Sequence, residues 1–255
     1  AIALTIGAVG LKFALSSDKQ IDKTINNGVS ISTDEDEDSV SNKKMTDSLL
    51  DDSSLADDYY DGLINKNVKM IVIACGTASA ISYKFLKNKY NIEIKNIIEP
   101  AVKSLKDTNI GVIATKATIN SNAWENAILK MHPSAKVTSV ACPLFVPLIE
   151  EGFIENPATD FVIKEYMKNF DGKNISSLIL GCTHYPLLKE KIKKSFDYEI
   201  NLIDVGEASA LDTKSYLDEN MLNNDRNHIG ICSFFSSDDF NDFIQKAKCI
   251  GIDVE

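Results

Sequence analysis

The sequence predicts an α/β fold with mostly parallel sheets flanked by helices, and two observations support this class. Short apolar runs recur along the chain, of the kind found in strands that are covered on both faces. Segments with helical periodicity separate these runs, as in proteins built from strand–helix–strand units. Ligands in such folds bind at the carboxyl ends of the strands, so we expect a functional site there.

The expected strands and helices alternate from residue 69 onward. The strands cover residues 69–74, 110–114, 136–141, 176–180, 202–205 and 229–235. The helices cover residues 120–131, 160–169, 207–218 and 238–247, and a further helix begins near Pro186. Residues 61–67 have the character of a helix end that precedes the first of these strands.

The N-terminal region differs from the rest of the chain. Residues 1–15 are apolar except for Thr5 and Lys12, and two interpretations stay open. They form either a strand followed by a glycine-containing turn, or the remnant of an anchor that tethers the protein to a membrane; a full span needs about 20 apolar residues. Residues 16–58 are rich in Asp, Ser, Asn and Lys, so we expect an acidic disordered linker.

Charge and cysteine usage exclude several classes of function. The net charge is −10, and residues 1–61, with 13 acidic residues and five lysines, carry −8 of it. This balance argues against a nucleic-acid partner. The five cysteines include no CxxC pair, so free thiols in a reducing, cytoplasmic compartment are expected. No two histidines have metal-ligand spacing, so we expect no metal site.

Two cysteines follow apolar strands in the same way, and we call these two strand–turn segments the cysteine elbows. Cys75 comes after residues 70–74 and Cys182 after residues 177–181, each with a small residue before the Cys and a Thr within two positions after it. The start of a following helix would lower the pKa of such a thiol. The Thr hydroxyl and nearby amide groups could hold a carboxylate at the same place.

The alternative is that these cysteines are structural, because free Cys is among the most buried residue types. That interpretation suits a single cysteine better than a matched pair. Cys142 also follows a strand but has no hydroxyl or His after it, so we expect it in the core. Cys232 and Cys249 are expected to be structural as well.

Two thiols that face one another across a cleft suit the inversion of a carbon stereocentre. This reaction needs a base on one face of the carbon and an acid on the other, and thiols can exchange these roles. His184, two residues after Cys182, could tune that thiol, although a lone His at a helix start is often only a surface residue.

Four segments of the chain, taken in order, resemble the signature segments of bacterial glutamate racemases. They are residues 73–80 (IACGTASA), 114–118 (ATKAT), 141–148 (ACPLFVPL) and 180–187 (LGCTHYPL). The resemblance covers roughly residue 60 to the C-terminus. It implies cofactor-independent racemisation of L-glutamate to D-glutamate for peptidoglycan synthesis, with two pseudo-symmetric three-layer domains. The first domain would comprise residues 59–99 plus 206–255 and the second residues 100–205.

The resemblance also implies roles for individual residues. Cys75 and Cys182 would be the two acid/base residues, with His184 and Glu150 in supporting catalytic roles. The implied substrate-binding positions are Gly76, Thr77, Thr118 and Thr183.

The chain departs from the family pattern in its first part. Residues 1–60 lack the opening Asp-Ser-Gly segment and a later Pro-Tyr-Gly loop, so the first domain would be incomplete. Residues 1–15, or a second copy in a homodimer, would then have to cover the exposed edge of the first sheet. Gly76 replaces the usual Asn, which removes a polar contact and should enlarge the space beside the first thiol.

These departures leave alternatives to a glutamate racemase open. One is a racemase-like protein that has lost catalysis and serves binding or regulation. The other is a racemase of another amino acid, such as aspartate.

Overall fold

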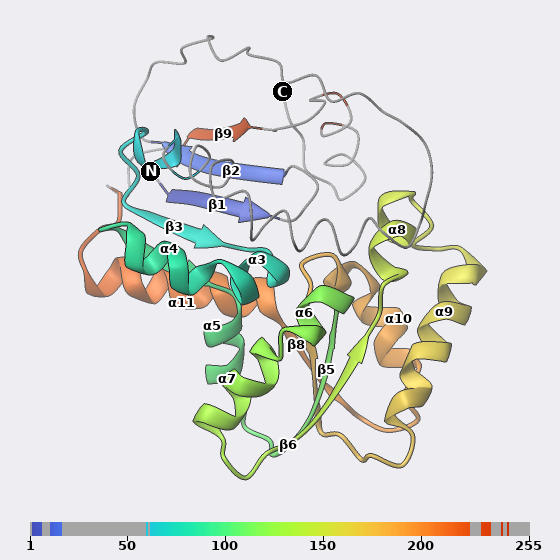
Figure 1. Cartoon of the computed structure of the whole chain (residues 1–255). Helices are drawn as coiled ribbons and strands as arrows, with labels where there is room; N and C mark the ends of the chain where they lie inside the picture. The colour runs from blue at the N-terminus through green and yellow to red at the C-terminus, as the bar shows by residue number, and fades with distance from the viewer. Residues whose placement is uncertain are drawn as a thin grey trace.

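The computed structural model describes residues 2–6, 11–16, 60, 62–224, 231–235, 241 and 244, which build two β-sheets with helices around them (Figure 1). The first sheet has the strand order β4-β3-β1-β2-β9 and the second the order β6-β5-β7-β8. The predicted α/β class is therefore confirmed.

The second sheet is entirely parallel. Its strands are β5 (Asn109–Ala114), β6 (Lys136–Ala141), β7 (Ser177–Leu180) and β8 (Asn201–Asp204). All four residues of β7 are buried, and so are the last five of β5, as expected for central strands covered on both faces. The carboxyl ends of these strands therefore lie along one edge of the sheet.

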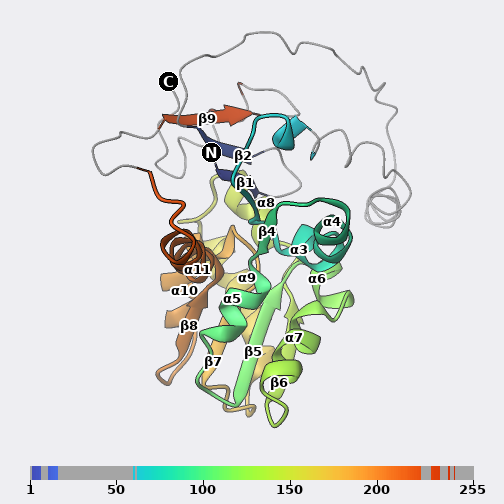
Figure 2. The same ribbon diagram turned by 90° about the vertical axis from the view of Figure 1, so that its left-hand side faces the viewer.

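Helices cover both faces of the second sheet (Figures 1 and 2). The helices of one face are α5 (Ile98–Lys103), α7 (Ala123–Met131) and α11 (Val205–Glu219), and those of the other are α8 (Phe145–Glu150), α9 (Pro157–Met167) and α10 (Lys189–Lys194). Alternate residues of one strand enter the two cores: Val112 packs with Trp124, and Ile113 packs with Phe145.

The first sheet is mixed. Its strands are β1 (Ile2–Ile6), β2 (Leu11–Ser16), β3 (Met70–Ile73), β4 (Glu93–Asn96) and β9 (Ile231–Phe235). β1 and β4 both pair with β3 in parallel, whereas β2 pairs with β1 and β9 in antiparallel fashion. The buried strand β3 thus has a partner on each side, and the exposed edge expected from the sequence is covered by residues 2–6.

Residues 2–6 and 11–16 are strands, as one of the two interpretations of the N-terminal apolar segment expected. No helix in the described ranges is both long enough and apolar enough to cross a membrane. The predicted linker at residues 16–58 lies outside the described residues, apart from Ser16 at the end of β2. The predicted helix at 238–247 also falls outside them, except that Asn241 and Ile244 are helical.

Several predicted boundaries shift for local reasons. The helix expected over residues 120–131 is α7, which begins three residues later, after Asn122, whose φ of 55° is left-handed; the short helix α6 (Lys116–Asn120) before it was not predicted. The helix expected at 160–169 begins earlier, because the Asn156 side chain accepts a hydrogen bond from the Ala158 amide and Pro157 follows at the first helical position.

The sequence did not predict β4, α4 (Tyr83–Lys89) or α5, whereas α3 (Gly76–Ile81) is the helix start expected after Cys75. α3 begins directly after the first cysteine elbow and leads into α4. The first thiol therefore lies at the amino end of a short helix.

Candidate active site

A pocket lies where the carboxyl ends of strands from both sheets meet. It encloses about 450 Å³ of empty space, part of it open to solvent. Its lining includes all eight residues proposed from the sequence: Cys75, Gly76, Thr77, Thr118, Glu150, Cys182, Thr183 and His184. A single pocket thus joins the two cysteine elbows.

The first elbow holds its thiol at the start of α3. Cys75 is the N-cap residue of this helix, and its sulfur accepts a hydrogen bond from the Ala78 amide at 3.5 Å. Its backbone is extended (φ −87°, ψ 128°), which is the usual geometry for an N-cap. The Ala78 amide is therefore the described hydrogen-bond partner of this partly exposed thiol.

The second elbow holds its thiol beside a side-chain relay. The Cys182 sulfur lies 3.8 Å from Nδ1 of His184, and Nε2 of the same ring lies 3.1 Å from Oε1 of Glu150. Glu150 comes from the end of α8, so two elements on the same side of the second sheet build this relay. The imidazole connects a buried thiol to a carboxylate, as expected for a group that receives or returns a proton.

Burial controls the pKa of the second thiol. Burial raises the pKa of Cys182 to about 12; a hydrogen bond from the backbone amide of His184 opposes the shift, and the nearby Cys75 and Glu150 charges add to it. The expectation that this elbow lowers its thiol pKa is therefore wrong. The reason is the burial of the sulfur in the core, next to the 3-10 helix η2 (Tyr185–Leu188) that the chain enters after Cys182.

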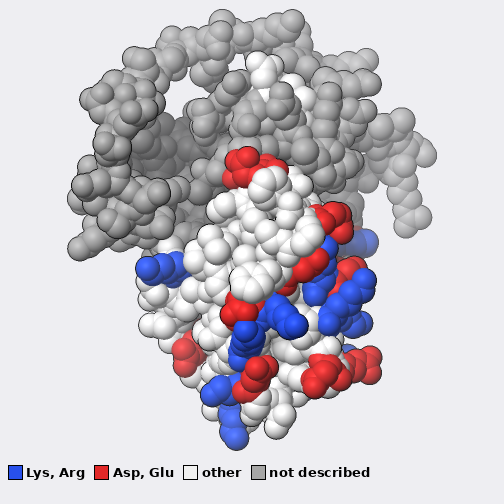
Figure 3. All heavy atoms as spheres, turned by 90° about the vertical axis from the view of Figure 1, so that its right-hand side faces the viewer, with Lys and Arg blue, Asp and Glu red and all other residues white. Residues whose placement is uncertain are grey.

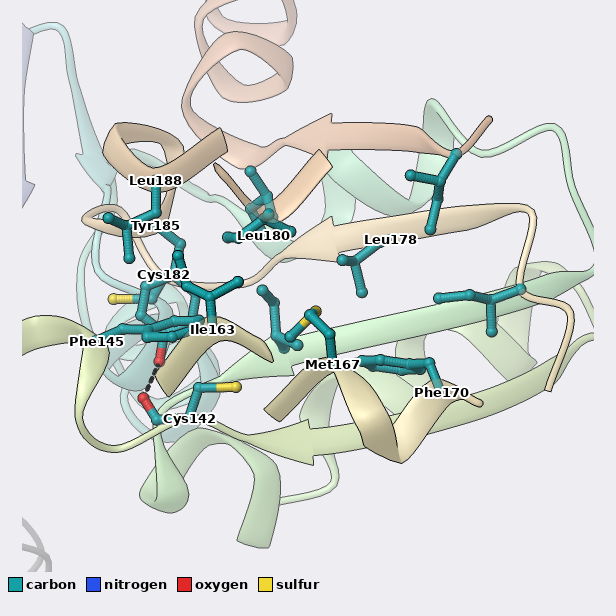
Figure 4. Close-up of a cluster of buried hydrophobic side chains, with 14 of the residues drawn as sticks. Cys142, Phe145, Ile163, Met167, Phe170, Leu178, Leu180, Cys182, Tyr185 and Leu188 are labelled. Atoms are coloured by element: carbon teal, nitrogen blue, oxygen red, sulfur yellow. Dashed lines mark hydrogen bonds between the residues drawn. The ribbon is translucent and has the colours of Figure 1, made fainter. Parts of the chain in front are cut away.

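The core behind the second elbow fixes its position (Figure 4). The buried Tyr185 hydroxyl donates to the carbonyl of Cys142 at 2.8 Å, and the Tyr185 ring packs edge-on against Phe145. The Cys142 side chain is fully buried, as the sequence predicted, whereas the sulfur of Cys182 points away from Ile163 at the rim of this cluster. Only one of these two thiols therefore lines the pocket.

Three threonine hydroxyls form a triangle in the pocket. Thr77 lies 3.1 Å from Thr115 and 3.0 Å from Thr118, and these two lie 2.9 Å apart. Thr77 belongs to α3 beside the first sheet, whereas Thr115 caps α6 at the end of β5. The triangle joins the two halves of the site. Each hydroxyl has one proton, which would have to turn from its neighbour in the triangle to donate to a bound anionic group.

Gly76 does not enlarge the pocket as expected from the sequence. A Cβ built on Gly76 would overlap the carbonyl oxygen of Gly181, so the second elbow already fills the space that the missing side chain leaves. The two elbows touch through their backbones at this point.

Sequence reasoning missed three lining residues: Thr115, Val146 and Gly181. Thr115 carried a usable signal, because it follows the end of β5 and precedes Thr118 by one helical turn. Within the part of the chain that the structure describes, no Lys or Arg lines the pocket. A carboxylate bound there would rely on hydroxyl and amide donors.

Charged side chains elsewhere pair across the surface. On the face shown in Figure 3, basic and acidic side chains lie next to one another over the helices. Lys191 contacts Asp160 at 2.9 Å and Glu155 at 3.1 Å, and Asp212 contacts Lys95 at 2.8 Å. These charges neutralise one another locally, in agreement with the small net charge outside residues 1–61.

Known proteins resemble this chain in sequence and fold. The family model for Asp/Glu/Hydantoin racemase matches residues 28–212. A glutamate racemase of Oceanobacillus iheyensis is 37% identical over 195 residues, which span 74% of this chain and 71% of that protein. A glutamate racemase of Aquifex aeolicus is 45% identical over 159 residues, or 61% of each chain.

A crystal structure of glutamate racemase from Francisella tularensis, in complex with D-glutamate, has a similar fold. It superposes with a TM-score of 0.61 at 43% identity and covers 65% of this chain and 63% of that one. The chain thus spans about three fifths to seven tenths of the length of these relatives. Taken together, the matches show that the chain belongs to the Asp/Glu/Hydantoin racemase family.

Proposed function

We propose that the protein racemises glutamate without a cofactor, by proton exchange at Cα between Cys75 and Cys182. The observation that carries this proposal is that two thiols, one from each sheet, line the same pocket. Such an arrangement supplies one acid/base group to each face of a bound amino acid.

The reaction balances with these two groups alone. One cysteine, as the thiolate, takes the proton from Cα, and the thiol on the opposite face gives its proton to the resulting planar carbanion. The cysteine that took the proton ends as a thiol and the other ends as a thiolate, while the configuration at Cα of the amino acid has inverted. The reverse reaction uses the same groups with exchanged roles.

His184 and Glu150 would serve the second thiol. Because burial raises the pKa of Cys182, its thiolate needs support when it forms. A neighbouring imidazole, itself hydrogen-bonded to a carboxylate, can stabilise that charge or carry the proton. Glu150 acts through the ring and is therefore a positioning residue.

Glutamate is the proposed substrate. The relatives are named glutamate racemase, and one of them was crystallised with D-glutamate. The hydroxyls of Thr77, Thr115 and Thr118 would donate to a substrate carboxylate, joined by Thr183 on the facing elbow. The D-glutamate formed would supply peptidoglycan synthesis, which is the role that the resemblance implies.

We further propose a cytoplasmic location, because a reducing compartment keeps both thiols free. The strands at residues 2–6 and 11–16 favour the strand interpretation of this segment over an anchor remnant. A homodimer stays a proposal. A second copy is not needed to cover the edge of β3, because β1 of the same chain pairs with it. Sedimentation velocity of the full chain would test it.

Deuterium uptake at Cα of glutamate in heavy water, followed by NMR, tests the function. We expect uptake with the unaltered protein and none above background with Cys75→Ala or Cys182→Ala. Cys142→Ala, at the buried cysteine outside the pocket, is the matched control and should keep the activity. No uptake above a boiled sample by the unaltered protein would refute the proposal.

The same experiment separates the alternatives. Glutamate binding by calorimetry without any uptake would identify a racemase-like binding protein. Faster uptake with aspartate than with glutamate would change the substrate and keep the chemistry.

A further inference from the structure

Gly181, the residue before the second thiol, is held from three sides. Its amide donates to the carbonyl of Ile113 on β5 at 2.7 Å. A Cβ built on it would lie 2.8 Å from Nε1 of Trp124 and 2.9 Å from the Ile113 oxygen, closer than real Cβ atoms approach. Its carbonyl oxygen faces Gly76 of the other elbow. This peptide has no free space on any of these sides.

Gly76 makes the contact that joins the two elbows. Because a Cβ there would overlap the Gly181 carbonyl oxygen, only glycine permits this approach of the two backbones. Gly76 follows Cys75 directly and Gly181 precedes Cys182 directly. The distance between the two thiols is therefore tied to this single backbone contact.

Trp124 packs against Gly181 at the place that a Cβ would occupy. It lies on α7, its side chain is 1% exposed, and it packs in the core between α7 and the second sheet. In the described part of the chain its buried indole N–H has no hydrogen-bond partner. An unpaired buried donor destabilises a fold. Because this N–H makes no described hydrogen bond, the side chain acts on Gly181 by van der Waals contact.

We propose that Trp124 is a positioning residue: through Gly181 and Gly76 it sets the separation of Cys75 and Cys182. The inference rests on the proposed racemase function and adds to it a residue outside the pocket. The three residues are neighbours in turn: the ring of Trp124 lies beside Gly181 where a Cβ would be, and the Gly181 carbonyl oxygen lies against Gly76. We call these residues the contact column.

The column matters because both thiols must reach the same carbon from opposite faces. A misplacement of about 1 Å in a catalytic group can cost about a hundredfold in rate. Substrate binding would depend mainly on the threonine triangle, because Gly76 lines the pocket but has no side chain with which to hold a substrate. A disturbed column should therefore lower kcat and leave KM largely unchanged.

The test is a cycle of variants at Gly76 and Trp124, measured by the rate of glutamate racemisation. We expect Gly76→Ala to lower kcat at least tenfold, with KM within threefold. Trp124→Leu, which frees the Gly181 peptide, should also lower kcat about tenfold. Trp124→Phe keeps a ring without the N–H and should retain kcat within threefold.

The double variant Gly76→Ala with Trp124→Leu gives the decisive result. The space behind Gly181 lets its peptide move away from the new methyl group, so the double variant should have a higher kcat than Gly76→Ala alone. Losses that simply multiply would overturn the proposal. A higher kcat in Gly76→Asn, which restores the residue usual in the family pattern, would overturn it as well.

Thermal unfolding keeps this inference separate from the proposed function. Gly76→Ala should lower Tm, and the added Trp124→Leu should recover part of the loss. The matched control is Gly62→Ala, because a Cβ at Gly62 meets nothing within 4 Å and Tm should not fall. If the unaltered protein does not racemise glutamate, the function fails while the Tm cycle still decides the contact. An unchanged Tm in Gly76→Ala would refute the contact.

Discussion

The two cysteine elbows share a sequence pattern but surround their thiols differently. Cys75 is partly exposed and caps a helix, so a backbone amide contacts its sulfur. Cys182 is buried and faces an imidazole–carboxylate pair, and burial raises its pKa. An acid/base pair can thus be assembled from one thiol supported by the backbone and one supported by side chains.

Removal of the His184 imidazole, which supports only the second thiol, should lower kcat more than the other changes below. His184→Asn is expected to lower kcat on the order of a hundredfold, because the Cys182 thiolate loses its neighbouring acid/base group. The racemisation rate from each enantiomer, followed by circular dichroism, measures this. His132→Asn is the control, since the described hydrogen bond of the His132 ring is to the Val102 carbonyl, away from the pocket. Equal rates in both variants would contradict the relay.

Removal of the carboxylate should have a smaller effect. Glu150→Gln keeps the size of the side chain but weakens a charge-assisted hydrogen bond to His184 worth about 1.5 kcal/mol, or about tenfold in kcat. Its neighbour Glu151 is exposed on the same helix end, so Glu151→Gln is the matched control. The pH–rate profile should shift in the first variant only. A profile that moves equally in both would rule out a specific role for Glu150.

Changes at the threonine triangle, which joins the two halves of the site, should affect substrate binding instead. Thr115→Val removes one hydroxyl of the threonine triangle and should raise KM for glutamate about fivefold, since one hydrogen bond contributes about 1 kcal/mol. Initial-rate kinetics measure KM, with Thr108→Val at an exposed position as the control. A fall in kcat at unchanged KM would assign Thr115 to the chemistry.

The buried thiol should also make stability depend on alkaline pH. The pKa of Cys182 is raised by burial from 9.0 to about 12, so above about pH 9 the unfolded chain releases this proton while the folded protein keeps it. Stability is therefore present in full below pH 9 and falls as the pH rises toward 12. Urea unfolding at about pH 7 and pH 10 measures the loss, which should be smaller in Cys182→Ala. Equal losses would show that other groups dominate.

Local patterns were sufficient to predict much of the fold. The buried strands β3, β5 and β7 were predicted within about a residue, because their buried side chains form consecutive apolar runs in the sequence. The more exposed strand β6 was predicted with the same bounds. The antiparallel pairing of β2 with β9 was not predicted, because it joins segments more than 200 residues apart that carry no mutual signal.

The site was predicted as a set of residues but not as a set of interactions. All eight proposed residues line the pocket, whereas the raised pKa of Cys182 and the contact between Gly76 and Gly181 were not foreseen. The strand–turn pattern specifies where a thiol leaves the sheet. How deeply it is buried depends on η2, which follows Cys182 directly, and on α8, which packs against it from another part of the chain.

The strand order of the first sheet also has a consequence for synthesis on the ribosome. The strands of the second sheet all lie between residues 109 and 204, so they can pair before the C-terminal part of the chain emerges. The edge of β2 that faces away from β1 can be covered only after residues 231–235 have been synthesised. The half that carries Cys182 can therefore mature first, and a nascent chain stopped before β9 would expose a strand edge prone to pair with other chains.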